Sequence, residues 1–528
     1  MDQFATDGTN CSISDSIPQQ LYRPEQVREM EAEAAARAGV DMWELMQRAG
    51  AAGWQCLQQQ SQPHERVAVL CGPGNNGGDG YVLAALARDA GRAVRLFASA
   101  EPKSEDGQRA LQLWLDSGGD VEPLLDWSES EPDWVVDGLL GTGIDSDLRG
   151  DIRECVEAVN EAKLSVLALD IPTGLHGDTG CALGDAIVAD HTVTFVGVKR
   201  GLCTGAAAAY RGKLWFADLG IQREFRLLTE PAAWNLQQEQ LTSWLPRRSP
   251  YTHKGVHGHV LILGGSRGMA GAARLAGSAA LRAGAGKVTV ICEPGQEYLV
   301  GQQPELMVLG LEPKDAQVAE LMEQATVFAM GPGLGQQAWG KNWWSWYLDG
   351  LERSDPLFEM PTVLDADALN WLARSALEVS TRSHWVLTPH PGEAARLLDC
   401  HGTDVEANRW LAAQTLQEQF GGVVVLKGAG SVICGSEGTA VSQFGTPAMA
   451  SAGMGDVLTG MISALMAQAN GLSITMEDSV RAAVMVHGLA GESAAQSLSQ
   501  GLGSEVSRGL LASDLFPWIV QWMNPNDA

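Results

Sequence analysis

The sequence predicts an α/β protein with two different domains. The chain has 528 residues, which is more than a single hydrophobic core usually serves. Apolar runs of strand length alternate with segments of helix length, a pattern typical of parallel sheets covered by helices. The pattern stops in residues 222–257, which are polar and contain three prolines, and then starts again. We therefore expect a first domain over residues 22–225, a linker over 226–245 and a second domain over 246–528.

The first domain is expected to begin with helices in residues 22–62. Asp41 precedes a helical stretch and Glu44 follows three residues later, which is the pattern of a helix N-cap with its capping partner. Strands are then expected at "RVAVLC", "RAVRLFA", "DWVVDGLL", "LSVLALD" and "HTVTFVG".

The second domain shows a second series of strand-like runs: "HVLILGG", "KVTVIC", "TVFAMGPG", "PTVLDAD", "HWVLTPHPG" and "GVVVLKGAG". The stretch "VVLKGAGSVI" predicts a strand, a glycine turn and another strand, and the last large helix is expected to start near "GDVLTGMISALMAQ". The two series are not obvious repeats of each other, so we expect two different domains.

The amino-acid composition and the net charge limit the kinds of molecule that the protein is expected to bind. Hydrophobic residues make up 45% of the chain and charged residues 19%, as in ordinary globular proteins. The net charge of −28 argues against a nucleic-acid surface or an anionic membrane as partner. It does not argue against phosphate ligands, because helix N-termini bind anions through backbone N–H groups even in an acidic protein.

The start of the chain and the cysteines indicate the compartment. Residues 1–21 are expected to form a disordered tail, because the first sixteen have neither a basic residue nor an apolar segment typical of a signal peptide. No apolar stretch reaches the roughly 18 residues of a membrane helix. The nine cysteines are scattered without a CxxC pair, which favours a reduced, cytoplasmic location and argues against a zinc site.

The loop "GPGNNGGDG", residues 72–80, lies between a predicted strand and a predicted helix. Gly72, Gly74 and Gly77 formally match the dinucleotide fingerprint GxGxxG, but no carboxylate follows the second strand until Glu101, so the match is weak. The absence of Gly-Lys-Ser/Thr excludes a P-loop.

Other strand ends in this domain carry polar residues as well. The carboxyl ends of parallel strands lie on one edge of a sheet, so five side chains are expected to converge there: Asn76, Asp79, Asp137, Asp170 and Thr173. Their oxygen atoms would suit a hard cation. The alternative is that these residues only serve turns, and three such strand ends in one domain argue against it.

The stretches "GPGNNGGDG", "VVDGLLGTG" and "LALDIPTGLHGDTG" strongly resemble the epimerase domain of NAD(P)H-hydrate repair enzymes, across about residues 22–225. The resemblance implies a Rossmann-like three-layer αβα sandwich. It also implies a potassium ion held by Asn76, Asp137 and Thr173, with Asp170 as the proton-transfer residue at the reacting centre. Asp79 and Asp137 remain alternatives for the base. The residues implied to bind the hydrated dinucleotide are Asn75, Asn76, Gly77, Gly78, Asp79, Gly141, Thr142, Gly143, Ile144, Asp145, Ser146, Asp147 and Asp170.

In the second domain, "SAGMGDVLTG" places Gly453 and Gly455 at a helix N-terminus with Asp456 beside them. Free N–H groups there stabilise a developing phosphoryl charge, and the carboxylate is suited to removing a hydroxyl proton. The alternative is an ordinary glycine-rich cap with an acidic first turn. Lys427, in a glycine turn, could meet a nucleotide, and His390 at a strand end is either structural or catalytic.

This second set resembles the ribokinase-like dehydratase domain of the same enzymes, over about residues 240–520. The resemblance implies a magnesium ion and a catalytic Asp456. Met454 stands where family members often carry Thr or Ser, which removes a side-chain hydroxyl but keeps the backbone N–H. ADP is expected at Lys427, Gly428, Ala429, Gly430, Ser431 and Gly455, and the hydrated nicotinamide at Ala272, Gly333, His390 and Asp456.

The two resemblances together imply repair of hydrated nicotinamide coenzymes. The first domain would interconvert the R and S epimers of NADH hydrate and NADPH hydrate. The second would dehydrate the S form with ADP, releasing AMP and phosphate. We expect a cytoplasmic homo-oligomer with no nucleic-acid or membrane partner. Two alternatives stay open: an ATP-dependent ribokinase-type small-molecule kinase with a nucleotide-binding accessory domain, and a first half that only senses nucleotides or acts as a scaffold.

Overall fold

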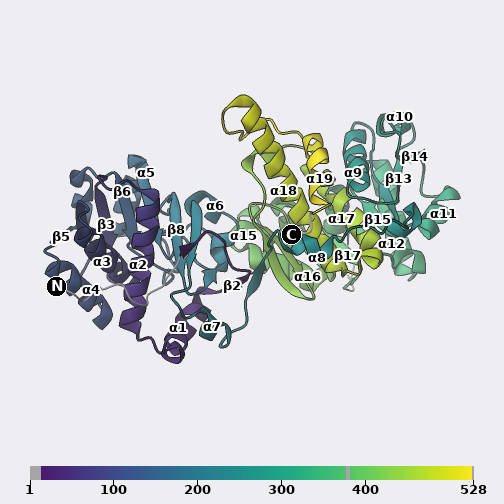
Figure 1. Ribbon diagram of the computed structural model, residues 1–528. Coiled ribbons are helices and arrows are strands. Elements are labelled where there is room, and N and C mark those ends of the chain that lie inside the picture. The colour runs from purple at the N-terminus through teal and green to yellow at the C-terminus, as the bar shows by residue number, and fades with distance from the viewer. Residues whose placement is uncertain (1–12, 376–380, 526–528) are drawn as a thin grey trace. The chain divides into compact units, whose positions relative to one another are not determined.

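The computed structural model describes residues 13–375 and 381–525, and the chain divides between Asn235 and Leu236 into two compact units (Figure 1). This boundary falls inside the expected linker 226–245. The segment is not a plain connection, because it contains strand β11 (Ala233–Asn235) and helix α8 (Gln240–Trp244).

The first unit contains a sheet with the strand order β1-β10-β8-β7-β6-β3-β4-β5. All neighbouring pairs are parallel except β1 with β10. The strands are β1 (Ile13–Ser14), β3 (Val67–Cys71), β4 (Val94–Ala98), β5 (Val121–Pro123), β6 (Trp134–Gly138), β7 (Ser165–Leu169), β8 (His191–Phe195) and β10 (Lys213–Ala217). Apart from this sheet, β2 (Gln20–Tyr22) pairs with β9 (Val198–Lys199) and with β11.

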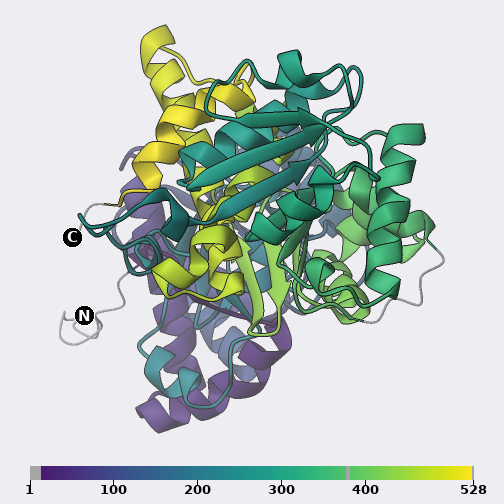
Figure 2. The same ribbon diagram turned by 90° about the vertical axis from the view of Figure 1, so that its right-hand side faces the viewer.

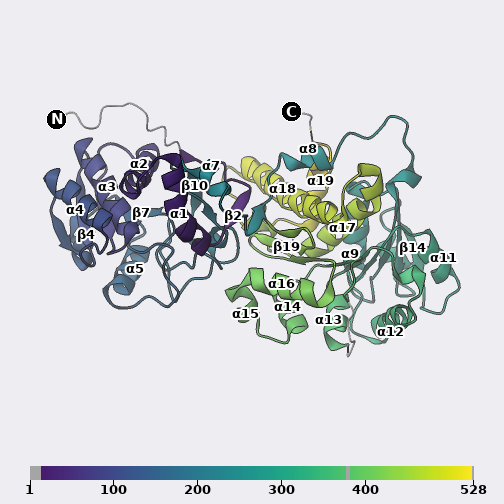
Figure 3. The same ribbon diagram turned by 90° about the horizontal axis from the view of Figure 1, so that it is seen from below.

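Helices cover both faces of this sheet, as the alternation of strand side chains requires. Val67, Val69 and Cys71 pack on the face covered by α1 to α4, whereas Ala68 and Leu70 pack on the face covered by α5 (Figure 3). The predicted αβα sandwich is confirmed. The helices are α1 (Pro24–Ala38), α2 (Met42–Gln60), α3 (Asn75–Asp89), α4 (Glu105–Asp116), α5 (Gly150–Ala162), α6 (Ala207–Tyr210) and α7 (Gln222–Arg226).

Two expectations near the N-terminus have different outcomes. Asp41 does cap α2, since its side chain accepts the backbone N–H of Glu44 at 2.7 Å. The disordered tail over residues 1–21 is wrong for residues 13–21, because β1 pairs with β10 and β2 with β9 and β11, and Leu21 is fully buried. The first twelve residues lie outside the described part.

The sheet of the second unit has the strand order β14-β13-β12-β15-β16-β17-β18-β19-β20. It is parallel from β14 to β18, and β19 and β20 are antiparallel additions. The strands are β12 (His259–Leu263), β13 (Lys287–Cys292), β14 (Met307–Gly310), β15 (Val327–Met330), β16 (Thr362–Leu364), β17 (Trp385–Leu387), β18 (Val423–Leu426), β19 (Ser431–Gly435) and β20 (Gly438–Ser442).

Helices also lie on both faces of this second sheet (Figures 2 and 3). Helices α9, α17, α18 and α19 share one core with the strands, and α12 to α16 lie on the opposite face. The helices are α9 (Ala270–Arg282), α10 (Glu297–Val300), α11 (Gln317–Gln324), α12 (Ala338–Glu352), α13 (Asp367–Arg374), α14 (Pro391–Leu398), α15 (Gly402–Ala407), α16 (Arg409–Phe420), α17 (Met454–Leu472), α18 (Met476–Leu502) and α19 (Phe516–Trp522).

Each sheet has a point where the chain reverses the direction in which it adds strands. In the first unit this point lies between β3 and β6, and in the second between β12 and β15. Loops at the carboxyl ends of such neighbouring strands diverge, and ligands bind in the crevice between them. Within residues 13–375 and 381–525, no helix combines the length and apolar character that crossing a membrane requires.

Candidate functional site

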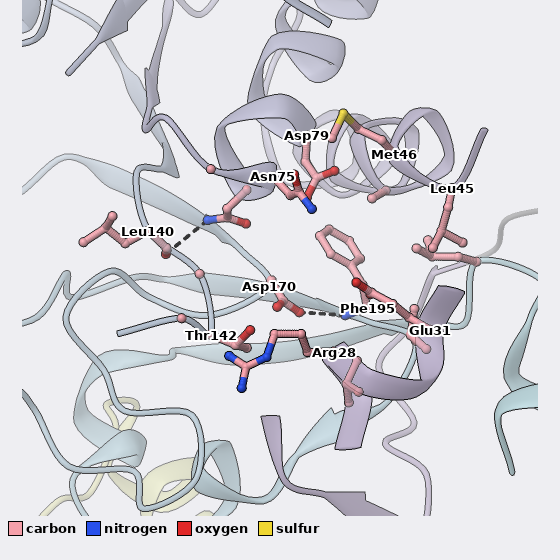
Figure 4. A pocket seen from close by; sticks show the side chains of 18 of the residues that line it. Arg28, Glu31, Leu45, Met46, Asn75, Asp79, Leu140, Thr142, Asp170 and Phe195 are labelled. Atoms are coloured by element: carbon pink, nitrogen blue, oxygen red, sulfur yellow. Dashed lines mark hydrogen bonds between the residues drawn. The ribbon is translucent and has the colours of Figure 1, made fainter. Parts of the chain in front are cut away.

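A cavity of about 350 Å³ lies at the switch point of the first unit (Figure 4). Its walls come from α1, α2, the starts of α3 and α4, the loop after β6, the ends of β7 to β9 and the chain just after β10. The polar side chains that line it are Arg28, Glu31, Asn75, Asn76, Asp79, Asp106, Thr142, Asp170 and Lys199. Met42, Leu45, Met46 and Ala49 of α2 add an apolar wall. Such a cavity suits a polar ligand that carries a flat apolar group.

The loop after β3 packs tightly against the loop after β6. A Cβ atom at Gly72 would overlap the carbonyl oxygen of Leu139, and one at Gly77 would overlap that of Gly72, so only glycine fits at either position. Helix α3 starts with Gly74 as its N-cap and no side chain caps it. Uncapped N–H groups at a helix start attract anions, and Gly74, Asn75 and Asn76 line the cavity.

Asp137, at the end of β6, is fully buried. Its Oδ2 accepts the backbone N–H of Thr173 at 2.7 Å, and its Oδ1 accepts the Thr173 hydroxyl at 2.7 Å. Burial raises the pKa of Asp137 to about 6, and the bonds from Thr173 oppose the rise. No Lys or Arg side chain in the described part of the chain pairs with this carboxyl group.

Asn76, near Asp137, also has a buried polar atom without a partner among the described residues. Its Nδ2 donates to the carbonyl oxygen of Leu140 at 3.2 Å, and its buried Oδ1 has no hydrogen-bond partner among the described residues. The N–H of Leu140 in turn donates to the Thr173 hydroxyl at 2.9 Å. An amide oxygen without a hydrogen-bond partner and a buried carboxyl group without a charged partner among the described residues therefore belong to one network, and a cation would complete it.

Asp170 follows β7 and is held from three sides. Its Oδ1 accepts the ammonium of Lys199, the N–H of Phe195 at 3.1 Å and the hydroxyl of Thr194 at 3.2 Å. The Lys199 side chain is only 2% exposed and also donates to the Phe195 carbonyl at 2.9 Å. Asp170 has a left-handed φ of 60°, which a non-glycine residue keeps only where its surroundings fix it.

Two further carboxyl groups line the same cavity. Burial raises the pKa of Glu31 to about 7, and the negative charge of Asp170 adds to the rise while Lys199 and Arg28 oppose it. Burial also raises the pKa of Asp79 well above its usual range, with further repulsion from Asp170 and Glu31.

At the switch point of the second unit, the loop after β12 packs on the loop after β15. The N–H groups of Gly265 and Ser266 donate to the carbonyl of Gly333 at 2.9 and 2.7 Å. Gly333 has a φ of +60°, and a Cβ atom there would lie 3.2 Å from the Cβ of Ala272. The structure thus places the predicted residues Ala272 and Gly333 side by side.

Helix α17 begins with Gly453 as its N-cap, at a φ of 91° and without a side-chain cap. Asp456 lies in its first turn and is half-buried. Burial raises the pKa of Asp456 to about 7, and the charge of Asp365 adds to the rise while Lys427 opposes it. A carboxyl group that titrates near neutral pH therefore sits beside uncapped helix N–H groups.

Asp365, after β16, holds Lys427 close to this helix. Its Oδ1 accepts Lys427 Nζ at 2.9 Å and the Thr388 hydroxyl at 2.8 Å, and its Oδ2 accepts the Thr459 hydroxyl at 2.7 Å. Lys427 Nζ also lies 3.8 Å from Glu393 Oε2. Burial alone would raise the pKa of Asp365, but the ammonium and the hydrogen bonds outweigh it and lower that pKa.

His390 and the turn after β18 complete this region. Nδ1 of His390 accepts the N–H groups of Gly392 and Glu393 at 3.0 and 3.3 Å, so this histidine caps α14. A Cβ atom at Gly428 would lie 2.6 Å from the guanidinium of Arg409. Arg409 donates to the carbonyls of Leu426 and Lys427, just before this glycine, and the Ser431 hydroxyl donates to the carbonyl of Gly428 at 3.2 Å.

Comparison with known proteins decides what these sites belong to. Residues 43–201 match the family model described as YjeF-related protein N-terminus, and residues 260–507 match that of NAD(P)H-hydrate dehydratase. The bifunctional NAD(P)H-hydrate repair enzyme of Escherichia coli is 41% identical over 98% of this chain and 97% of its own. That of Coxiella burnetii is 39% identical over 96% of this chain and 99% of its own.

The chain belongs to the bifunctional NAD(P)H-hydrate repair enzymes. Its epimerase and dehydratase activities are those predicted, and both alternatives, the small-molecule kinase and the sensing module, are wrong. A solved structure of the ADP/ATP-dependent NAD(P)H-hydrate dehydratase of Bacillus subtilis, co-crystallized with ATP and Mg²⁺, is 27% identical over 55% of this chain and 96% of that one, with a TM-score of 0.44.

The repair enzyme's first site contains only part of the residues predicted to bind the dinucleotide. Those that line the cavity are Asn75, Asn76, Asp79, Gly141, Thr142, Gly143, Ile144 and Asp170. Gly77 and Gly78 are instead buried in α3, while Asp145, Ser146 and Asp147 are exposed residues outside the lining. The motif search missed Arg28, Glu31 and Lys199, which also line the cavity. The one available signal was that Lys199 closely follows a strand.

The second site brings Lys427, His390 and Asp456 into one region through residues that the motif search did not assign. Lys427 contacts Asp365 and Glu393, and the backbone N–H of Lys427 donates to Pro389 O, next to His390, at 2.9 Å. Asp365 was visible only as part of "LDADALN" at a strand end.

Proposed function

We propose that the cavity of the first unit epimerises hydrated NADH and NADPH, and that the site around Asp456 dehydrates the S epimer with ADP, releasing AMP and phosphate. One observation carries the proposal. In each unit, a carboxyl group that is placed for proton transfer lies near the start of a helix without a side-chain cap.

The chemistry of the substrate explains why two sites are needed. Protonation of the enamine carbon of a dihydronicotinamide leaves an iminium ion, and water then adds at the ring carbon next to nitrogen. The product has two epimers at this carbon. A dehydratase that binds one of them needs an epimerase to supply it from the other.

In the first unit, we assign proton transfer to Asp170 and binding of the diphosphate to the start of α3. Asp170 is rigidly placed, lines the cavity and is held by Lys199. The N–H groups of Asn75 and Asn76 begin a helix without a side-chain cap, which suits phosphate oxygens. The apolar wall of α2 would receive the ring.

Asn76, Asp137 and Thr173 fit a potassium ion. Support comes from the unpaired Oδ1 of Asn76 and from the buried carboxyl group of Asp137, which lacks a charged partner among the described residues. A monovalent cation there would supply positive charge beside the substrate's phosphates. The protein's own residues fix the loop after β6 through the bonds from Thr173 to Asp137 and from Leu140 to Thr173.

In the second unit, Asp456 removes the proton from the substrate hydroxyl as that oxygen attacks the β-phosphorus of ADP. The oxygen bridging to the α-phosphorus leaves with AMP. The N–H groups from Gly453 to Gly455 bind the transferring phosphoryl group. In the phosphorylated hydrate, the carbon–oxygen bond then breaks, phosphate leaves, and loss of a proton from the neighbouring carbon restores the dihydronicotinamide.

ADP and magnesium are proposed to bind beside this helix. ADP would contact the turn formed by Lys427, Gly428, Ala429, Gly430 and Ser431. Hydrogen bonds from Arg409 hold the backbone at the start of this turn. Magnesium would offset the phosphate charge. The described residues contain no metal-binding group of three or more His, Cys, Asp or Glu side chains, and magnesium commonly binds through substrate phosphates with few protein carboxylates.

Two single substitutions test this division of labour. Asp456→Asn should lower the rate of ADP-dependent recovery of NADH by about 10²- to 10⁴-fold, the usual contribution of a general base, and leave epimer exchange intact. Asp170→Asn should do the reverse. Chromatography separates the epimers, and the absorbance of NADH reports dehydration.

The matched controls are exposed aspartates outside both sites, Asp151→Asn on α5 and Asp349→Asn on α12. Both controls should keep both activities. A folded Asp170 or Asp456 variant that lost both activities, or neither, would contradict the assignment.

A further inference from the structure

We propose that Glu31 is a second proton-transfer residue of the epimerase, acting together with Asp170 on the same substrate. This inference rests on the proposed function of the first-unit cavity. It concerns a residue of α1, upstream of the segment that matches the N-terminal family model.

Epimer exchange requires an acid and a base in the same cavity. To invert the carbon that bears the hydroxyl, its carbon–oxygen bond must break while a proton is delivered to the departing oxygen. The lone pair of the ring nitrogen then forms a double bond to this carbon, and water leaves. A water molecule that adds to the opposite face must lose a proton to a base. The group that protonates the departing oxygen and the group that accepts the proton of the new water lie on opposite faces of the ring. A single carboxyl group cannot reach both faces, so two groups are needed.

The positions of Glu31 and Asp170 suit two such roles. Both side chains line the cavity of about 350 Å³, and they come from different walls, one from α1 and the other from the end of β7 (Figure 4). A ring bound between these walls would present one face to each carboxyl group.

The partners of the two carboxyl groups differ. Asp170 accepts three hydrogen bonds at Oδ1, including that of the Lys199 ammonium. The carboxyl group of Glu31 has no hydrogen bond or ion pair with any described residue. It is half-buried, so it is free to turn toward a ligand and to give up a proton.

Burial favours the protonated form of Glu31 near neutral pH, and the charges that face this residue act in both directions. They are Arg28 on its own helix, Asp79 on α3, Asp170 after β7 and Lys199 on β9, whereas α2 contributes only apolar lining. Burial is the largest influence, and it raises the pKa of Glu31 to about 7. Two carboxyl groups in one site whose surroundings differ are the usual arrangement for an acid–base pair.

In the proposed step, Glu31 gives its proton to the departing hydroxyl as the carbon–oxygen bond breaks, and Asp170 takes the proton of the water that adds from the other side. In the opposite direction the two carboxyl groups exchange roles: Asp170 donates a proton to the departing hydroxyl and Glu31 accepts the proton of the water that adds. Protons then pass between the carboxyl groups and solvent before the next turnover. No electron is gained or lost, and no further reactant is needed.

Glu31→Gln tests the proposal, because glutamine keeps the shape but has no proton to give. The substrate is the R epimer that remains after exhaustive ADP-dependent dehydration by the Asp170→Asn enzyme. At pH 7 and without ADP, kcat of epimer exchange should fall by about 100-fold or more, while KM changes by less than about threefold. Dehydratase activity should be unchanged, which shows that the variant is folded. Glu31→Asp should recover part of the lost rate.

The pH profile separates proton transfer from a structural role. In the wild-type enzyme, kcat of exchange should decrease as pH rises through about 7, because Glu31 loses the proton that it must donate. In Glu31→Gln this decrease should be absent. The matched control is Glu29→Gln, an exposed position on the same helix outside the cavity lining, which should retain both the rate and the profile.

Two outcomes would overturn the inference: a Glu31→Gln enzyme that keeps its rate within about threefold, or one that loses rate but keeps the alkaline decrease. Either result leaves the proposed function standing as long as Asp170→Asn abolishes exchange. If Asp170→Asn also keeps exchange, the proposed function of the cavity is wrong.

Discussion

Two neighbouring aspartates of the dehydratase unit, Asp365 and Asp456, have opposite acid–base properties because their partners differ. Asp365 accepts Lys427 and two threonine hydroxyls, and these interactions lower its pKa despite complete burial. Asp456 lacks such partners, and burial together with the charge of Asp365 raises its pKa to about 7. One cluster therefore contains a permanent anion that fixes Lys427 and a base that can accept a proton near neutral pH.

Replacing Asp456 by asparagine should stabilise the dehydratase unit more at pH 8 than at pH 5. The unfolded carboxyl titrates near 3.8 and the folded one near 7. Between these values the folded state keeps a proton that the unfolded state has released, so wild-type stability falls as pH rises and stays low above pH 7. Asparagine removes this penalty. We expect the gain in unfolding free energy at pH 8 to exceed that at pH 5 by about 1–2 kcal/mol.

Differential scanning calorimetry of both proteins at the two pH values measures this difference. The exposed control Asp349→Asn should change stability by less than about 0.5 kcal/mol at either pH. An equal gain from Asp456→Asn at pH 5 and pH 8 would show that the folded enzyme does not shift the titration of Asp456.

Single residues also show where sequence reasoning stopped. Asp137 ends a strand, and Asn76, Asp170 and Thr173 follow strands, so the geometry of a parallel sheet is enough to predict that they share one edge. No sequence pattern distinguishes Glu31, since α1 carries Glu25, Glu29 and Glu33 as well. Only the packing of α1 beside the strand ends places Glu31 in the cavity. Contacts between distant parts of the chain leave no local pattern.

At the scale of elements, the position of Asp456 depends on how closely α17 packs against α9. Gly460 lies one turn after Asp456, and a Cβ atom there would overlap the carbonyl oxygen of Ala276 on α9. The first turn of α17 is thus held against the helix that follows the switch-point loop of β12. Small residues along α9 allow the same close approach, with Ala273, Ala276 and Ala280 fully buried.

Gly460→Ala should therefore destabilise the dehydratase unit by about 1–3 kcal/mol, the usual cost of overpacking, and lower ADP-dependent dehydration without changing epimer exchange. Gly471→Ala is the matched control in the same helix. Its new Cβ atom would be 3.5 Å from the nearest atom, the carbonyl oxygen of Val256, so higher helix propensity should leave stability equal or raise it by up to about 1 kcal/mol. Thermal unfolding measures both. Equal losses in the two variants would mean that a glycine in α17 matters for the helix itself and not for packing on α9.

The elements that the sequence predicted correctly are the ones with a strong pattern. Buried runs such as "HVLILGG" and "GVVVLKGAG" mark β12 and β18 because four or more apolar residues stand together. The pattern missed β1, β2, β5, β9 and β11, which have two or three residues each. It also missed the longer strands β10, β14 and β20. The shortest strands are defined by the partner that they pair with, so a tail was expected in place of β1 and β2 and a linker in place of β11.

At the scale of the whole molecule, each unit contains its own site. Every residue that lines the epimerase cavity lies between Val27 and Leu219, inside the first unit. The residues that surround Asp456, from Asp365 to Lys427, belong to the second. A substitution that removes one activity should therefore leave the other site intact, and we expect the substrate to travel between the sites as a released epimer.

A mixture of the Asp170→Asn and Asp456→Asn enzymes should therefore convert both epimers although neither variant does so alone. With ADP, the Asp170→Asn enzyme should restore NADH only from the S share of an epimer mixture and then slow to the rate of uncatalysed exchange. The Asp456→Asn enzyme should restore none. When the two are combined, the R epimer exchanges at the intact cavity of one chain, leaves into solution and is dehydrated by the other. The second phase should accelerate in proportion to added Asp456→Asn enzyme until dehydration limits it, and NADH absorbance follows the course. If conversion still stopped at the S share, the epimers would have to pass between the two sites of a single chain without release.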